Sequence, residues 1–139
     1  VYRIKGEEKP AREALRYSKL VRKYVPEKDD CPIFDIILLG MSKEGDTSSI
    51  FSGQEQLLSS TQIYEVSQNL HDGQTRISLT GHPMTKARYV MFLITGKAKA
   101  DMVCKILTSG DTSPAAYIYH HANNAEMFLD AGAASQLKQ

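Results

Sequence analysis

The chain has 139 residues and a formal net charge of +1, with 17 lysines and arginines against 16 acidic residues. This length fits one domain over residues 1–139, and the balanced charge without a basic patch argues against nucleic-acid binding. No apolar run approaches the ~18 residues that span a bilayer, and no signal peptide opens the chain, which predicts a cytoplasmic protein with no membrane partner.

The first expected element is a helix that begins near Pro10, because proline suits the first helical turn. Small and apolar residues then recur at helical spacing as far as Val25, and Pro26 ends the run. Residues 34–39 (FDIILL) form a short apolar run with a single charge, as in a strand buried on both faces of a parallel sheet.

Three further strands are expected along the chain. Residues 62–66 and 76–80 show shorter strand patterns, and residues 89–95 (YVMFLIT) are the clearest buried strand. Because helical patterns separate the strands, the sequence predicts an α/β fold with a mostly parallel sheet.

The C-terminal third is expected to hold two helices and a strand. A helix should follow Gly96 and stop at Gly110. Its inward residues are expected to be Ala98, Met102, Val103, Ile106 and Leu107. Residues 127–129 are expected as a last short strand, and Asp130 as the N-cap of a closing helix over AGAASQL.

Ligands of open α/β sheets bind at the loops that follow the carboxyl ends of the strands. Residues 40–49, 80–82 and 96–99 are such loops in the expected sheet. The last loop places Lys99 in the first turn of a helix, where free amides and an ammonium make a seat for phosphate. A lysine in that position is more often a solvated surface residue, and this alternative stays open.

Residues 34–51 (FDIILLGMSKEGDTSSIF) resemble the active-site loop of the 6-phosphogluconolactonases, whose usual form is D-x-x-L-L-G-M-G-x-D-G-H-T-A-S-L-F-P. The likeness continues through RISLTGHPMTKARYVMFLITGKAKADMVCKIL and ends in FLDAGAASQL, in the family's order and spacing. It implies a Rossmann-like three-layer α/β sandwich, a fold shared with the glucosamine-6-phosphate deaminases. The deaminases continue this loop with I-A-F-N-E-P, so the TSSIF of this chain favours the lactonase branch.

The resemblance implies hydrolysis of 6-phospho-D-glucono-1,5-lactone to 6-phosphogluconate in the oxidative pentose phosphate pathway, with no metal or organic cofactor. The reaction needs a phosphate anchor, a base that activates water and a proton donor for the departing ring oxygen. An arginine and a lysine suit the anchor, and glycines let the backbone pass close to the sugar. Carried over by position, the substrate-binding candidates are Gly40, Met41, Gly45, Thr47, Arg76 and Lys99.

The loop departs from the family pattern where the chemistry lies. The family histidine taken as the general base aligns with Asp46, the aspartate two residues earlier with Glu44, and the second motif glycine with Ser42. A free aspartate has a pKa of ~3.9 against ~6.5 for histidine, so it is a weaker base at neutral pH and has no proton to give. Asp46 and Glu44 are therefore the catalytic candidates of a loop that we expect to be much less active than the family norm.

The amino-terminal half of the family, with its Gly/Ser-rich phosphate loop, has no counterpart in this sequence, which begins at Val1 in a polar segment. We therefore expect a partial domain that corresponds to the carboxy-terminal portion of the fold. Its sheet should expose an edge and apolar surface unless the missing half or a second copy covers them. Such a piece should have little activity alone.

The histidines and cysteines outside the motif give weaker signals. His71 precedes Arg76 in a turn, where exposure to solvent is favoured over a role in the site, and His82 follows a strand end. His120 and His121 lack a third ligand at metal spacing. The two cysteines, Cys31 and Cys104, lie far apart without CxxC spacing, so a metal site or a disulfide framework is not expected.

Residues 47–49, with their hydroxyl groups, are expected to cap a helix after the loop rather than to supply a nucleophile. Two functions then remain open. One is a phosphosugar lactonase, whole or truncated. The other is a non-catalytic sugar-phosphate-binding paralogue that kept Arg76 and Lys99 but lost the histidine.

Overall fold

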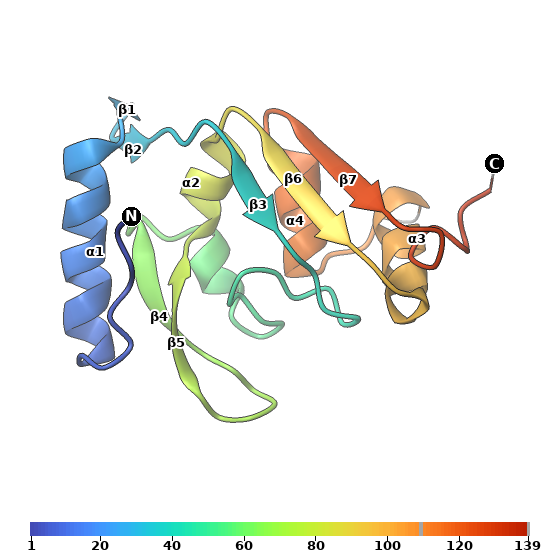
Figure 1. Cartoon of the computed structure of the whole chain (residues 1–139), viewed down its shortest axis with the longest axis horizontal. Coiled ribbons are helices and arrows are strands. Elements are labelled where there is room, and N and C mark those ends of the chain that lie inside the picture. Colours follow the sequence, from blue (N-terminus) through green and yellow to red (C-terminus); the bar gives the residue numbers. More distant parts are fainter. Residues whose placement is uncertain (109, 139) are drawn as a thin grey trace.

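The computed structural model describes residues 1–108 and 110–138. Its central feature is a three-stranded parallel sheet, which confirms the expected α/β class. The strands are β3 (Ile37–Leu39), β6 (Val90–Ile94) and β7 (Ala125–Leu129), in the order β3-β6-β7. Because β6 pairs with both neighbours, the strand with the clearest sequence pattern lies in the middle of the sheet (Figure 1).

Helices cover one face of this sheet. Helices α2 (Gly81–Lys86) and α4 (Pro114–His121) lie behind it in Figure 1, and α3 (Ala100–Thr108) follows β6 near the end of the sheet that carries the strand C-termini. The core consists of alternate strand residues and the inward faces of these helices, with Phe92, Ile94, Met84, Val103, Ile106 and Ile118 almost fully buried. Among the described residues, no helix is long and apolar enough to cross a bilayer.

The other face of the sheet is open, and the expectation that residues 34–39 form a strand buried on both faces is wrong. Leu38 of β3 is 63% exposed, Leu93 of β6 is 55% exposed and Phe128 of β7 is 42% exposed. In the parallel register Leu93 lies beside Phe128, so these side chains share the face opposite the helices. A continuous apolar run cannot reveal that only one of its two faces is covered.

A second unit lies to the side of the parallel sheet. Strands β4 (Tyr64–Gln68) and β5 (Thr75–Leu79) form an antiparallel hairpin, against which α1 (Pro10–Tyr24) packs (Figure 1). Both strands were expected from the sequence, but they do not join the parallel sheet. The five-residue strands and the turn between them instead project toward the end of the sheet that carries the loop after β3.

Two short strands and two 3-10 turns complete the described elements. Strands β1 (Glu27–Lys28) and β2 (Cys31–Pro32) pair antiparallel after α1. The 3-10 turns are η1 (Glu55–Leu58) and η2 (Lys97–Lys99), the second of which leads into α3.

Several C-terminal expectations need correction. The described residues contain no closing helix: residues 131–137 (AGAASQL) form a series of turns after Asp130. The Asp130 carboxylate does accept a hydrogen bond from the Ala133 amide, as an N-cap would. In the helix expected after Gly96, Ala98 and Leu107 are exposed instead of inward; Ala98 lies in the 3-10 turn before α3. Gly110 has a φ of +68°, as a helix stop requires, and its neighbour Ser109 lies outside the described residues.

Candidate active site

The loop after β3 and the turn after β6 lie at the same end of the sheet, because the two strands are parallel (Figure 1). The first comprises residues 40–50 and the second residues 95–99. This is the end at which open α/β sheets bind ligands. Two of the three loops that the sequence indicated thus lie at this end of the sheet. The third, residues 80–82, follows β5 of the separate hairpin and leads into α2.

The loop after β3 and the β4–β5 hairpin together enclose a cavity of about 430 Å³. The hairpin contributes Asn69, His71 and Arg76 to the lining. Of the predicted site residues, the cavity brings together Gly40, Met41, Glu44, Asp46, Thr47 and Arg76. Gly45 and Lys99 are not part of its lining.

Asp46 is buried, with 7% of its surface exposed, and its carboxylate is held by two donors. Oδ2 accepts a hydrogen bond from the Ser42 hydroxyl and Oδ1 accepts one from the Ser52 amide, both at 3.2 Å. The Ser42 hydroxyl in turn accepts hydrogen bonds from the amides of Glu44 and Asp46. A serine at the position of the second motif glycine therefore organises the turn that fixes Asp46, using its one donor and two acceptor sites.

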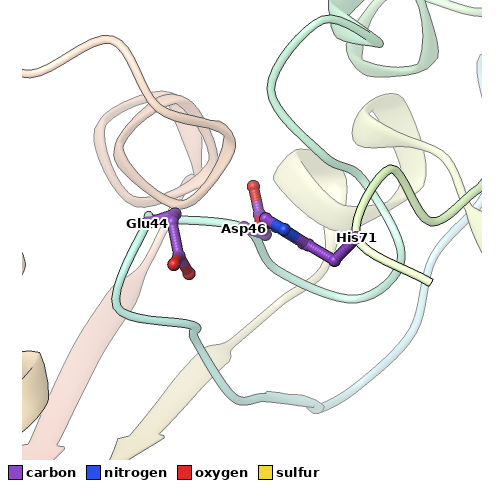
Figure 2. A group of neighbouring side chains, drawn as sticks. All are labelled: Glu44, Asp46 and His71. Atoms are coloured by element: carbon purple, nitrogen blue, oxygen red, sulfur yellow. Dashed lines mark ion pairs between the residues drawn. The ribbon is translucent and has the colours of Figure 1, made fainter.

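His71 brings an imidazole to this carboxylate from the hairpin. Its Nε2 lies 3.7 Å from Asp46 Oδ2, although the His71 side chain is 63% exposed. Figure 2 shows the His71 ring directed at Asp46, with Glu44 on the same loop as Asp46. The sequence favours an exposed turn histidine at this position, and the exposure is confirmed. The contact with Asp46 could not be predicted, because the two residues are 25 positions apart in the chain.

Glu44, Asp46 and His71 have potential ligand atoms that all lie within 4.8 Å of one another. A carboxylate and imidazole set of this kind can hold a metal ion, but Glu44 and His71 are exposed and carboxylates often lie this close without one. The hydrogen bonds of the buried Asp46 carboxylate are therefore stronger evidence for its role than its place in this cluster.

Arg76, from β5, lines the same cavity, and its guanidinium is paired with the adjacent turn. Its Nη2 lies 3.4 Å from Asp72 Oδ2 and 3.2 Å from Gln74 Oε1, both on the adjacent turn. Such an exposed ion pair contributes little, about 0–1 kcal/mol, so a phosphate can compete for the arginine.

Lys99 contacts the loop after β3, whereas the sequence predicts a contact with phosphate. Its ammonium donates a hydrogen bond to the main-chain carbonyl of Met41 and so joins the two strand-end loops. The Gly96 amide, at a φ of +99°, is also occupied, because it donates to the Asp130 carboxylate at 3.0 Å. Hydrogen bonds from the Ala133 and Gly96 amides lower the pKa of Asp130, as expected for a carboxylate that is held charged.

Gly45 packs against α4, a helix that was not expected from the sequence. A Cβ at position 45 would lie 2.5 Å from Ser113 Cβ, and the Gly45 carbonyl accepts a hydrogen bond from the Ala115 amide at 2.9 Å. Ser113 is the N-cap of α4 and Pro114 follows it at the first helical position, which is a start signal present in the sequence. The glycine is therefore required by packing against α4 and by its φ of +86°. Contact of Gly45 with a sugar stays a prediction.

The hydroxyl cluster of residues 47–49 does not cap a helix, so that expectation is wrong. The Thr47 hydroxyl donates to the Gly40 carbonyl at 2.6 Å and closes the base of the loop. The Ser78 hydroxyl of β5 lies 3.2 Å from the Ser48 hydroxyl and accepts the Ser49 amide at 3.2 Å. These contacts hold the loop against the hairpin and preserve the cavity between them.

The other histidines lie outside this cavity. His120 Nε2 lies 2.9 Å from the Ile106 carbonyl, and His121 Nδ1 lies 2.9 Å from the Tyr117 carbonyl. His82 lines a separate cavity of about 750 Å³ with residues of the β1–β2 region.

The fold and the position of the cavity define a Rossmann-like α/β protein with its candidate site at the strand C-termini. The family model described as glucosamine-6-phosphate isomerases/6-phosphogluconolactonase matches residues 1–128. The chain belongs to this family.

Relatives named 6-phosphogluconolactonase are similar along most of the chain. The protein of Treponema pallidum is 34% identical over 113 residues, which are 81% of this chain and 47% of the relative. The human protein is 32% identical over 134 residues, which are 94% of this chain and 52% of the relative. This chain spans about half the length of the curated relatives it matches.

Two solved structures show the same fold. The structure described as devB protein superposes with a TM-score of 0.92 at 32% identity and covers 99% of this chain and 58% of its own. The 6-phosphogluconolactonase of Trypanosoma brucei has a TM-score of 0.80 at 28% identity, covering 91% of this chain and 53% of its own. The resemblance found in the sequence is thus confirmed.

Proposed function

We propose that this chain carries part of a 6-phosphogluconolactonase site, which hydrolyses 6-phospho-D-glucono-1,5-lactone to 6-phosphogluconate in the oxidative pentose phosphate pathway. The observation that carries the proposal is the cavity at the strand C-termini, where the motif loop and Arg76 meet. Its relatives named 6-phosphogluconolactonase support the same substrate class. The activity of this chain alone is expected to be weak or absent.

In this proposal the sugar phosphate lies between the loop and the hairpin. Arg76 leaves its exposed pair with Asp72 to hold the phosphate through two parallel N–H donors. Gly40, Met41 and Thr47 lie along the sugar. Gly45 shapes the loop, and Lys99 holds the Met41 carbonyl, so that both act on the substrate mainly by positioning the loop.

The weak step in this proposal is activation of water. Asp46 occupies the position of the family histidine, and both its oxygens already accept hydrogen bonds. Glu44 is exposed and carries a second negative charge close to the cavity, which disfavours an anionic substrate. Asp46 as base and Glu44 as a second carboxylate are thus poor replacements for an imidazole.

The proposal also assigns a partner to the open face of the sheet. Leu38, Leu93 and Phe128 are large apolar side chains in solvent, and burial stabilises each by about 1.5–3 kcal/mol. The remaining half of the family domain, or a second copy of this chain, is the proposed cover. Both cysteines are free thiols, which agrees with a cytoplasmic location.

The alternative function is binding of a sugar phosphate without catalysis. It is favoured by one observation, the aspartate that is buried and hydrogen-bonded where the family has its base. In that case Arg76 and the loop would retain the ligand without hydrolysing it.

Lactone hydrolysis above the spontaneous rate tests the proposal. It is measured for the wild-type chain, for Asp46→His and for the matched control Asp35→His, an exposed aspartate outside the cavity. We expect Asp46→His to exceed the wild type and Asp35→His to match it. Binding of 6-phosphogluconate without hydrolysis by any variant would favour the non-catalytic alternative, and absence of both would refute the proposal.

A further inference from the structure

We propose that His71, from the hairpin, supplies the imidazole that the motif loop lacks and acts as the base, and that Asp46, from the loop, is its positioning residue. The inference rests on the proposed function, since it assigns the base for that reaction. It changes the role of Asp46 from a weak base to the carboxylate that orients a better one.

The geometry of the pair carries this inference. His71 Nε2 lies 3.7 Å from Asp46 Oδ2, and both residues line the cavity that Arg76 also reaches. The distance exceeds a hydrogen bond, as is common between catalytic groups before a substrate binds. The position that holds an imidazole in the family motif is thus faced by an imidazole from a different element.

Asp46 is suited to orient His71 because it cannot move freely. The Ser42 hydroxyl and the Ser52 amide hold its two oxygens, and only 7% of the residue is exposed. His71, in contrast, is anchored through its backbone amide, which donates to the Asn69 side chain at 2.8 Å, while its ring remains accessible. A carboxylate held in this way selects the orientation of the accessible ring in which Nε2–H points to Asp46.

The charged groups around His71 are mostly acidic. Asp46 and Glu44 face it from the loop, Asp72 adjoins it in the turn, and Arg76 lines the same cavity from β5. Arg76 is itself paired with Asp72, at 3.4 Å between Nη2 and Oδ2. The surroundings of the ring therefore suit the positive charge that develops on it in the transition state.

In the proposed reaction His71 takes one proton from water and later gives it to the ring oxygen of the lactone. With Nε2–H toward Asp46, Nδ1 of His71 takes a proton from water as the water oxygen bonds to the lactone carbonyl carbon. The tetrahedral intermediate then collapses, the bond from that carbon to the ring oxygen breaks, and the ring oxygen receives the proton from His71. The product is a carboxylic acid that loses its proton to solvent, and the neutral imidazole is restored.

Kinetics of four variants test this assignment. In the wild-type background, His71→Gln should lower kcat by about 100-fold, or to the spontaneous rate, with little change in KM. In the Asp46→His background, which restores the family residue, the same substitution should have no effect on kcat. His82→Gln, an exposed histidine outside the cavity, is the matched control and should behave as wild type.

A pH profile and a binding measurement separate catalysis from structure. The wild type should lose activity on the acidic side as its base becomes protonated, and His71→Gln should lack this decline. In NMR spectra of the wild type, 6-phosphogluconate should shift the imidazole proton signals of His71, assigned with the His71→Gln variant, and not those of His82. Circular dichroism checks that the hairpin variant folds.

Each remaining outcome decides between the two proposals. Hydrolysis by the wild type that His71→Gln leaves unchanged overturns the role of His71 while the lactonase function stands. Binding of 6-phosphogluconate that leaves the His71 signals in place, or binding without hydrolysis, likewise overturns His71 as base. A chain that neither binds 6-phosphogluconate nor hydrolyses the lactone refutes the proposed function, and this inference with it.

Discussion

The ammonium of Lys99 donates a hydrogen bond to the main-chain carbonyl of Met41, and this contact joins the turn after β6 to the loop after β3. The two residues are 58 positions apart in the sequence. The sequence indicated both loops as ligand sites but gave no sign that one supports the other. A lysine chosen as a phosphate contact is therefore also a structural support of the motif loop.

Replacement of Lys99 by methionine should destabilise the chain as well as weaken ligand binding. The substitution keeps an unbranched side chain but leaves the Met41 carbonyl without this donor, at an expected loss of about 1–3 kcal/mol. Urea unfolding measures it, with Lys97→Met, an exposed neighbour in the same turn, as control. An unchanged midpoint in Lys99→Met would show that the loop does not depend on this hydrogen bond.

Gly45→Ala should be more destabilising than Gly53→Ala, although both glycines have a positive φ. The values are +86° and +92°, so the backbone strain of an added Cβ is similar, about 1–2 kcal/mol. At Gly45 the new atom would also lie 2.5 Å from Ser113 Cβ, whereas at Gly53 the nearest atom is Leu70 Cδ1 at 3.7 Å.

The difference in unfolding free energy between these two variants isolates the clash with α4. We expect the Gly45 variant to lose at least about 1 kcal/mol more, in the range of overpacking effects. The double variant with Ser113→Gly should recover part of that difference. Equal losses in the two alanine variants would contradict close packing of the loop against α4.

The fold was predictable where local pattern and chain topology agree, and not where distant segments meet. β6 and α3 follow directly from YVMFLIT, Gly96 and the spaced apolar residues after it. The separate hairpin could not be inferred, because β4 and β5 show the same alternation whether they join a parallel sheet or pair with each other. Helix α4 could have been found from Ser113 and Pro114, which are an N-cap and a first-turn proline.

The sequence predicted the motif loop of the site but not the contacts that distant side chains make with it. The motif loop and Arg76 do meet at one cavity. The sequence favours an exposed turn histidine at position 71, since nothing in a turn sequence indicates which side chain a folded hairpin presents to a loop 25 residues away. Similarly, the motif identifies Ser42 only as the replacement of a glycine, whereas the structure shows that its hydroxyl organises the turn around Asp46.

Acid should weaken the attachment of the N-terminal segment to α1 through Glu13. This carboxylate is 1% exposed; the Arg16 guanidinium holds it at 2.6 Å and the Lys5 amide donates to it at 2.7 Å. These contacts, led by Arg16, lower the pKa of Glu13 to about 2 from 4.5. Because the folded-state pKa is the lower one, the stabilisation is present above pH 4.5 and is lost as the pH falls toward 2.

Glu13→Gln should therefore reduce stability at neutral pH and flatten its decline between pH 4.5 and 2. Thermal unfolding across this range measures both effects. Glu8→Gln, an exposed glutamate of the same segment, should leave the profile of the wild type unchanged. A Glu13→Gln variant with the same pH dependence as the wild type would show that other carboxylates cause the acid sensitivity.

The open face of the sheet should make the chain self-associate unless another half-domain covers it. Leu93 lies at the centre of this face on β6, beside Phe128 of β7, and is 55% exposed. Leu93→Lys should lower association in sedimentation measurements, because a charge on this face opposes its burial. Leu70→Lys, which changes a leucine that is 61% exposed on the β4–β5 turn, is the matched control.

Leu93→Lys and Leu70→Lys also identify which partner buries the open face of the sheet. If a separately expressed amino-terminal half of a related lactonase binds this chain and raises its lactone hydrolysis, Leu93→Lys should weaken that binding and Leu70→Lys should not. If Leu93→Lys dissociates a dimer of the chain and the added half has no effect, a second copy is the cover. A wild-type chain that stays monomeric and ignores the added half would show that this apolar face is stable in water without a partner.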